Sequence, residues 1–219
     1  MNDSKWARYA AIGGVAFVVL NIVGAVLSGS PPAANASAAK IAKYYADKDT
    51  GLKATLWLGG IGSVGLVWWF GSLWRRMSRA EAGAHRLSVV SLVGLGLGGA
   101  LFMASASVNA SVALHPADVG EGARVFYTLS TVLLSASGFG LAIHLFATNI
   151  LGLRAKMFPT WLAWVGVVAG LAFVVSAVLG SATDNASGLA AGLVGFIGWS
   201  VWVLGVSFGI WSDTPDAAS

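Results

Sequence analysis

Six long apolar runs, separated by short polar segments, dominate the hydrophobic pattern of this 219-residue chain. The runs cover residues 9–28, 53–74, 87–109, 124–151, 161–180 and 188–211. A helix of about 20 apolar residues crosses the hydrocarbon core of a bilayer. Because every run reaches that length, the pattern predicts an all-α fold, a six-transmembrane-helix bundle that forms a single membrane domain.

The longest polar connection, residues 29–52, follows the first run. Pro31 and the proline after it are expected to end the first helix, because proline cannot donate a backbone hydrogen bond. Ile41, Tyr44 and Tyr45 then recur at helical spacing. This spacing predicts a short amphipathic helix in the first outer loop, with its tyrosines facing inward and its lysines facing lipid headgroups. Such a helix either caps the bundle or forms a lid over a pocket.

Composition supports a membrane location. The chain is 57% hydrophobic and 10% charged, with a mean hydropathy of +0.77, whereas a soluble domain carries about 25% charged residues. It has no cysteine, which excludes disulfides, thiolate metal sites, iron–sulfur clusters and a nucleophilic thiol. The basic residues lie between the apolar runs and form no stripe with aromatics, so membrane lipids, and no nucleic acid, are the expected partners.

The distribution of lysine and arginine predicts the orientation. Eight of the 13 basic residues fall on the side of the N-terminus: Lys5, Arg8, Arg75, Arg76, Arg79, Arg86, Arg154 and Lys156. By the positive-inside rule, both termini, including the polar tail at 212–219, are expected in the cytoplasm, and the protein in the inner (plasma) membrane. The first run is longer than the 7–15 apolar residues of a typical signal peptide, so we interpret it as an uncleaved span.

Small residues are placed for close helix packing. Gly94 and Gly98 lie one turn apart in the third run, and Gly188 and Gly192 do so in the sixth. In lipid, helices associate through close backbone approach and interhelical hydrogen bonds. These glycine-rich faces are expected to pack the bundle, and they are also candidate surfaces for a protein partner or for a homo-oligomer.

The fourth run divides into a polar and an apolar half when drawn at helical periodicity. The polar half comprises Tyr127, Ser130, Thr131, Ser135, Ser137, Gly138, His144, Thr148 and Asn149. The apolar half comprises Leu129, Val132, Leu133, Phe139, Ile143 and Phe146. The polar half is expected to face the bundle, with Asn21 of the first run and Ser105 and Ser107 of the third run as hydrogen-bond partners.

Among His, Lys, Arg, Asp and Glu, His144 is the one residue in the interior of the six runs. It has no second intramembrane histidine for haem ligation and no neighbouring carboxylate for a proton relay. Two interpretations remain: a neutral imidazole hydrogen-bonded to an adjacent helix, or a contact to a ligand. The ligand pocket that the sequence predicts is lined by Tyr127, Ser130, Ser137, His144, Thr148 and Asn21.

The residues absent from the runs argue against catalysis, ion-coupled transport and metal binding. No Asp, Glu, Lys or Arg lies in the interior of a run, and no proline interrupts one, whereas ion-coupled transporters carry buried acids or broken helices. We therefore predict no catalytic residue, no cofactor and no metal site. Outside the runs, five residues offer cation ligands: Asp47, Asp49, His115, Asp118 and Glu121. The preferred interpretation is that Pro116 and the acidic residues after it begin a helix.

Three stretches carry a resemblance to a known group of proteins. They are SGSPPAANASAAKIAKYYADKDTGLKATLWLGGIG at 28–62, LWRRMSRAEAGAHRLS at 73–88 and residues 123–170, which include FPTWLAWVG. Over most of its length the chain resembles a family of uncharacterised six-span integral membrane proteins common in actinobacteria. The resemblance is one of topology and loops, and it implies no substrate, cofactor or active site.

These observations favour two functions. The first is a non-enzymatic membrane protein that acts as an accessory or scaffold subunit of a larger assembly. The alternative is a binder or carrier of a hydrophobic small molecule or lipid, with its pocket beside the fourth span.

Overall fold

The computed structural model describes residues 3–33, 35–81, 83, 85–182 and 186–213. In these ranges the chain is helical and contains no strand. The long helices are α1 (Asp3–Ser28), α3 (Asp49–Glu81), α4 (Arg86–Leu114), α6 (Ala123–Ala155), α7 (Thr160–Ala182) and α8 (Ala186–Ser212). All six are long and apolar enough to cross a membrane. The predicted all-α, six-span fold class is therefore confirmed.

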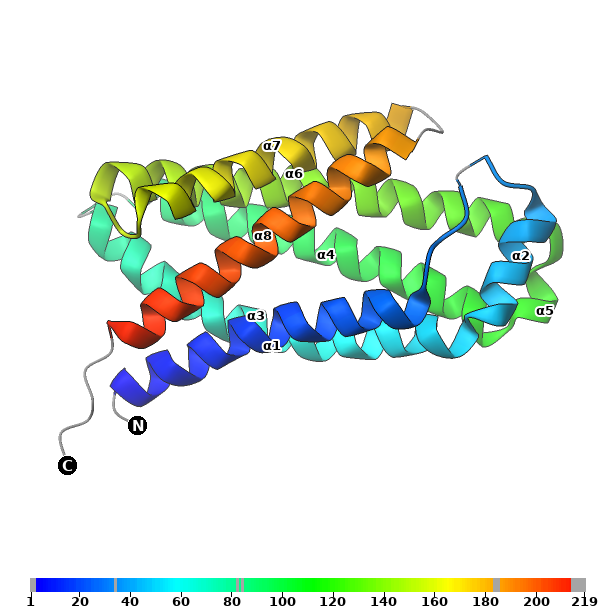
Figure 1. Ribbon diagram of the computed structural model, residues 1–219, viewed down its shortest axis with the longest axis horizontal. Helices are drawn as coiled ribbons and strands as arrows, with labels where there is room; N and C mark the ends of the chain where they lie inside the picture. The colour runs from blue at the N-terminus through cyan, green and yellow to red at the C-terminus, as the bar shows by residue number, and fades with distance from the viewer. Residues whose placement is uncertain (1–2, 34, 82, 84, 183–185, 214–219) are drawn as a thin grey trace.

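The six long helices form a closed ring in chain order, α1–α3–α4–α6–α7–α8, with α8 returning to α1. Each long helix runs antiparallel to the long helix before it, as in an up-and-down bundle (Figure 1). The first and last helices begin and end at the same end of the bundle, here called the terminal end (Figure 1). Helix α4 packs extensively on α6, and α1 on α3, whereas the α3–α4 and α8–α1 contacts are smaller. The ring therefore has two weaker seams.

The helices are longer than the apolar runs. Helix α1 begins at Asp3, and α3 extends from Asp49 to Glu81, several residues beyond the predicted 53–74 at each end. At its start, Lys53 Nζ lies 2.8 Å from an Asp49 carboxylate oxygen, one turn away. Polar residues of this kind continue a helix readily although hydropathy marks the apolar centre alone. The connection between α1 and α3 consequently ends at residue 48.

The opposite end of the bundle, here called the α2 end, carries α2 (Ala38–Asp47), α5 (Pro116–Val119) and the 3-10 turn η1 (Gly120–Gly122). Ser37 Oγ caps α2 by accepting a hydrogen bond from the Lys40 amide at 3.3 Å. The buried side chains of α2, Ile41 and Tyr45, pack on a hydrophobic cluster from the neighbouring helices. The cluster consists of Ile41, Tyr45, Leu52, Val112, Ala113, Ala123 and Tyr127. The predicted amphipathic helix is confirmed, and it covers packed side chains as a cap.

Two tyrosine hydroxyls fasten this cap to the spans. Tyr45 donates a hydrogen bond to Asn109 Oδ1 on α4 at 2.8 Å. Tyr127, near the start of α6, donates to the carbonyl of Pro32 at 2.5 Å and so holds the chain that leads into α2. Both bonds join α2 or its approach to a long helix, so they fix the cap over the α4–α6 pair.

At the terminal end, the α3–α4 turn is stabilised by the carboxylate of Glu81. Its oxygens accept hydrogen bonds from the amides of Leu87 at 2.7 Å and Ser88 at 2.9 Å, and from the Ser88 hydroxyl. These amides belong to the first turn of α4 and have no partner within their own helix. Glu81 therefore caps α4 from the last residue of α3.

The centre of the ring is filled by large side chains from opposite helices. Trp69 of α3 and Trp202 of α8 are both fully buried, with ring centroids 5.8 Å apart in an edge-to-face arrangement. Trp202 Nε1 donates to Asn149 Oδ1 of α6 at 2.9 Å. Tryptophan in membrane proteins concentrates at the interfaces, so these buried indoles were not anticipated from the sequence.

Candidate functional site

The polar half of α6 faces the interior, as its periodicity predicts. Six of its polar side chains are buried: Ser130, Ser135, Ser137, His144, Thr148 and Asn149. Four apolar residues on the other half are exposed on the outside of the bundle: Leu129, Val132, Phe139 and Ile143. Leu133 and Phe146 are exceptions, because both are half-buried, Phe146 where it packs over Gly170 of α7.

His144 is fully buried and takes part in a small hydrogen-bonded group. Its Nδ1 lies 2.8 Å from Ser91 Oγ on α4, and that hydroxyl lies 2.9 Å from Thr148 Oγ1. The imidazole packs edge-on between Phe70 and Trp202, each with a centroid 5.7 Å away. His144 is thus hydrogen-bonded to an adjacent helix, in agreement with the first of the two interpretations.

The remaining residues of the predicted pocket lie apart from one another. Tyr127 belongs to the cluster beneath α2, and Ser130 lies one turn further along α6, where its carbonyl accepts from Ser105 Oγ at 2.8 Å. Ser137 Oγ donates to a carbonyl of its own helix at 2.6 Å. Asn21 lies across the bundle on α1 and donates to the Phe17 carbonyl at 2.9 Å. The set is buried, but it is spread along two helices, and its members make separate contacts.

Two of the three expected hydrogen-bond partners of α6, Asn21 and Ser107, were wrong, because each bonds within its own helix. Ser107 of α4 is exposed, and its hydroxyl donates to the Met103 carbonyl of the same helix at 2.8 Å. Ser105, two residues earlier, points the other way and makes the contact with α6. A shift of two residues turns a side chain through about 200° on a helix, so both serines could not face the same neighbour.

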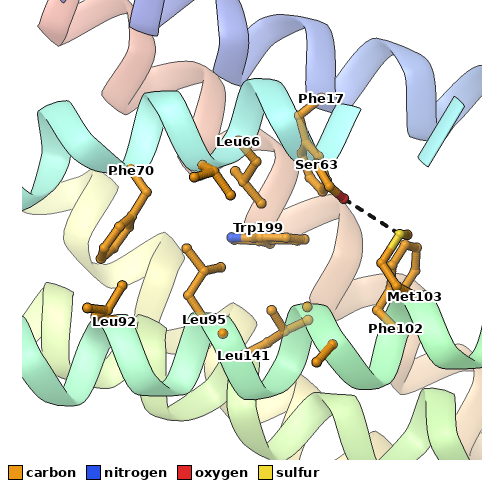
Figure 2. Close-up of a pocket in the computed structure, with 14 residues that line it drawn as sticks. Phe17, Ser63, Leu66, Phe70, Leu92, Leu95, Phe102, Met103, Leu141 and Trp199 are labelled. Carbon is orange, nitrogen blue, oxygen red and sulfur yellow. Dashed lines mark hydrogen bonds between the residues drawn. The ribbon is translucent and has the colours of Figure 1, made fainter. Parts of the chain in front are cut away.

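An apolar cavity with a volume of about 290 Å³ lies between α3 and α4. We call it the α3/α4 pocket (Figure 2). Its lining comes from α3 and α4 and, at the base, from one residue each of α1, α6 and α8. The lining residues are Phe17, Ser63, Leu66, Val67, Phe70, Leu92, Leu95, Gly96, Gly99, Ala100, Phe102, Met103, Leu141 and Trp199. None of the six residues predicted for a pocket is among them.

Two sets of glycines on α4 explain why the cavity exists. A Cβ at Gly94 would lie 2.7 Å from the His144 amide nitrogen, so this glycine allows α4 to approach the backbone of α6. Gly98 meets the Leu141 amide in the same way. A Cβ at Gly96 or Gly99, in contrast, would meet nothing within 4 Å in the described part of the chain. Helix α4 therefore packs closely on α6, while the small residues on its side toward α3 leave a space between α3 and α4.

The sequence carries a signal for this arrangement. Gly96 and Ala100 form a second small pair that is rotated by about 200° from the Gly94 and Gly98 pair. A single glycine-rich face accounts for one neighbouring helix. A second small face on the same helix indicates either another close helix or a space.

The polar groups of the α3/α4 pocket are few. Ser63 Oγ already donates to the Gly59 carbonyl at 2.8 Å and lies 3.9 Å from Met103 Sδ. Trp199 is 5% exposed, and its Nε1–H has no hydrogen-bond partner in the part of the chain that the structure describes. Figure 2 shows the indole edge-on across the pocket, with its nitrogen toward Phe70 and Leu95. The pocket thus combines an apolar lining with one unpaired donor.

The candidate cation ligands outside the spans do not come together. Among the described residues, no group of three or more His, Asp or Glu is placed to hold a metal ion. Asp47 and Asp49 pair with lysines of their own helices at 2.9 and 2.8 Å. The nearest approach is His115 Nδ1 to an Asp118 oxygen at 3.9 Å, while the side chain of Glu121 lies outside the described part. Pro116 begins α5, which confirms the helix-start interpretation.

These features define a class: a multi-pass membrane protein built as a six-helix ring, with an apolar pocket at one seam. Comparison of the chain with family models, with curated proteins and with solved structures gives no match. The resemblance to the actinobacterial six-span family stays a prediction.

Proposed function

We propose that this protein binds a hydrophobic small molecule in the α3/α4 pocket. The observation that carries the proposal is the cavity itself, whose volume of about 290 Å³ lies just below the roughly 300–1,000 Å³ of small-molecule sites. Its lining is aliphatic and aromatic, as in such sites. The rim residues Val67 and Leu92 are 68% and 46% exposed on the outside of the bundle, where the acyl chains of a membrane would lie.

A scaffold role draws less support from the arrangement of the glycines. Gly94 and Gly98 contact α6, Gly192 meets Ser176 of α7, and a Cβ at Gly205 would lie 2.7 Å from Leu162 of α7. The small residues that suggested a partner surface are therefore used for packing within the chain. Binding of a partner on other faces remains a separate proposal.

Binding is proposed in preference to catalysis because of the chemistry of the lining. Among the described lining residues, Ser63 is the one with a hydroxyl, and no histidine, lysine or carboxylate lines the pocket beside it. A serine nucleophile needs an adjacent general base. The buried His144 and Ser91 pair lies behind Phe70 and does not line the pocket.

For the orientation, we propose that the terminal end faces the cytoplasm and that the membrane is the plasma membrane. Support comes from arginine, which is concentrated near this end: Arg75, Arg76, Arg79, Arg86 and Arg154. Short loops rich in arginine and lysine remain on the cytoplasmic side during insertion. In this orientation α2 lies at the outer surface.

The binding proposal is tested by filling the pocket. Gly99→Leu adds a side chain on the wall of the pocket, where a Cβ meets nothing within 4 Å. Gly71→Leu is the matched control, because Gly71 on α3 is equally open and does not line the pocket. Thermal unfolding in detergent with excess alkylbenzene measures binding, since a ligand of the folded state raises Tm.

Added alkylbenzene is expected to raise the Tm of the wild type and of Gly71→Leu, and to leave the Tm of Gly99→Leu unchanged. Organic extraction of the purified wild type, followed by mass spectrometry, then identifies any molecule carried from the cell. An equal gain in Tm by all three proteins, or a gain by none, would contradict the proposal.

A further inference from the structure

The unpaired indole N–H of Trp199 restricts the chemistry of the ligand. A polar group buried in an apolar environment without a hydrogen-bond partner is costly, and within a membrane no bulk water compensates it. Trp199 is 5% exposed, and its Nε1 finds no acceptor within the described residues. Its nitrogen points toward Phe70 and Leu95, away from Phe17 (Figure 2). An apolar molecule in the pocket would leave this donor unpaired.

Water is a poor partner at this position. A buried water molecule is usually held by two to four polar atoms. Besides the indole, the described lining offers the hydroxyl of Ser63, which already donates to the Gly59 carbonyl, and the weak acceptor Met103 Sδ. The donor is therefore better matched by an oxygen that belongs to a largely apolar ligand.

The depth of Trp199 in the bilayer further restricts the class of ligand. Trp199 lies at the midpoint of α8, Ala186–Ser212, and hence near the centre of the bilayer. The centre is about 15 Å from either headgroup region, because the hydrocarbon core is about 30 Å thick. A phospholipid in its normal position carries its ester oxygens at the headgroup level, too far from the indole. The acceptor must belong to a molecule that dissolves in the hydrocarbon core.

The charge of the lining residues gives the last restriction on the ligand. None of the described residues that line the pocket is charged, and an unpaired charge at the centre of a membrane is strongly disfavoured. A fatty acid carboxylate is excluded on this ground. The acceptor is then a neutral oxygen, and a carbonyl presents its lone pairs at the end of a narrow group.

We propose that the ligand of the α3/α4 pocket is a neutral, lipid-soluble carbonyl compound, a ketone or quinone whose oxygen accepts a hydrogen bond from Trp199 Nε1–H. This inference rests on the proposed function and specifies its ligand. Trp69 Nε1 and His144 Nε2 also lack partners among the described residues, but neither residue lines the pocket. Of these three residues, Trp199 is the one that lines the pocket.

The test compares two matched probes, a medium-chain dialkyl ketone and the alkane of the same length, with protein in lipid nanodiscs. Trp199→Phe removes the N–H and retains an aromatic ring. Trp164→Phe, on the exposed face of α7, is the control. Trp199→Phe is expected to weaken ketone binding about tenfold, the factor for one buried hydrogen bond, and to leave alkane binding within about twofold. Trp164→Phe is expected to change neither.

The carbonyl stretching band of the bound ketone gives a second measurement that needs no variant. In the wild type the band is expected at lower frequency than in protein-free lipid, because a hydrogen bond weakens the carbonyl bond. A short-chain benzoquinone serves as a third probe and distinguishes the two kinds of carbonyl ligand. If it binds more tightly than the ketone, the pocket is a quinone site. If it binds more weakly, the pocket is a site for an open-chain ketone.

The outcomes separate this inference from the proposed function. In one outcome, Gly99→Leu weakens the binding of both the ketone and the alkane while Trp199→Phe weakens the binding of neither, or of both equally. If the carbonyl band is also unshifted, the pocket binds apolar molecules and the carbonyl inference is wrong. If Gly99→Leu weakens neither probe, or the wild type binds neither, the proposed function itself is wrong.

Discussion

Ser91 Oγ on α4 lies 2.8 Å from His144 Nδ1 on α6, in the interior of the bundle, where neither side chain is exposed. The same hydroxyl lies 2.9 Å from Thr148 Oγ1, so one serine joins two residues of the neighbouring helix. His144 in turn packs against Phe70, which lines the α3/α4 pocket. The group therefore supports the wall of the pocket from behind.

Ser91→Ala is expected to destabilise the bundle by about 1 kcal/mol, within the range for interhelical hydrogen bonds in membranes. The substitution leaves His144 Nδ1 without its partner and removes one partner of Thr148. Ser107→Ala is the control on the same helix, since this exposed hydroxyl bonds within α4. Denaturant unfolding in micelles measures both variants, and an equal loss of stability in the two would contradict the role given to Ser91.

His144→Leu is expected to leave alkylbenzene binding unchanged while lowering stability. His144 does not line the α3/α4 pocket, and Phe70 separates the two. Binding is measured by the Tm gain on adding alkylbenzene, relative to the ligand-free variant. Complete loss of that gain in a folded His144→Leu protein would place the histidine in the binding site.

Gly94→Ala is expected to cost about 1–3 kcal/mol, the usual range for overpacking. The added Cβ would lie 2.7 Å from the His144 amide nitrogen and 2.8 Å from the Gly140 carbonyl oxygen, and backbone atoms cannot rotate away. Gly60→Ala is the control, because its Cβ meets nothing within 4 Å among the described residues. The control is expected to gain about 0.5–1 kcal/mol from helix propensity. Comparable Tm values for the two variants would argue against the close α4–α6 approach.

The sequence allowed the inward face of α6 to be predicted, because helical periodicity alone decides which side chains share a face. His144, Thr148 and Asn149 lie where that periodicity places them. The α3/α4 pocket was not predicted, because a cavity depends on how far two helices separate, which is a property of tertiary packing. Gly96 and Ala100 line it, and their position opposite the packing glycines follows from helical periodicity.

Trp199 was missed for a different reason. Interfacial tryptophans are the common case in membrane proteins, so a tryptophan buried at the middle of a span was not expected. Trp199 lies in the middle of its helix, which a single sequence does show. That its nitrogen points into a cavity depends on the packing of α8 against α1 and α3, which helical periodicity does not determine.

Alkaline pH is expected to loosen α2. Burial, followed by the negative charge of nearby Tyr127, raises the pKa of Tyr44 from 10.0 to about 12. Between these values a detached α2 loses the Tyr44 proton more readily than the packed one, so docking is stable below pH 10 and weakens as pH rises toward 12. Tyr44→Phe is expected to lose less α2 packing over this interval, measured by proteolysis at Lys40 and Lys43. If proteolysis of Tyr44→Phe depends on alkaline pH in the same way as that of the wild type, groups other than Tyr44 cause the loosening of α2.

The orientation is testable with single cysteines, because the chain contains none of its own. Ala46 is exposed on α2, and Ala155 is exposed at the terminal end, between Arg154 and Lys156. Because the arginine-rich end is expected to stay in the cytoplasm, an impermeant maleimide should label Ala46→Cys in intact cells. Ala155→Cys should be labelled after the membrane is permeabilised and not before. The two sites lie at opposite ends of the bundle, so each serves as the control for the other. The reverse pattern would place the terminal end outside and would make α2 a cytoplasmic cap, while leaving the proposed position of the α3/α4 pocket within the membrane unchanged.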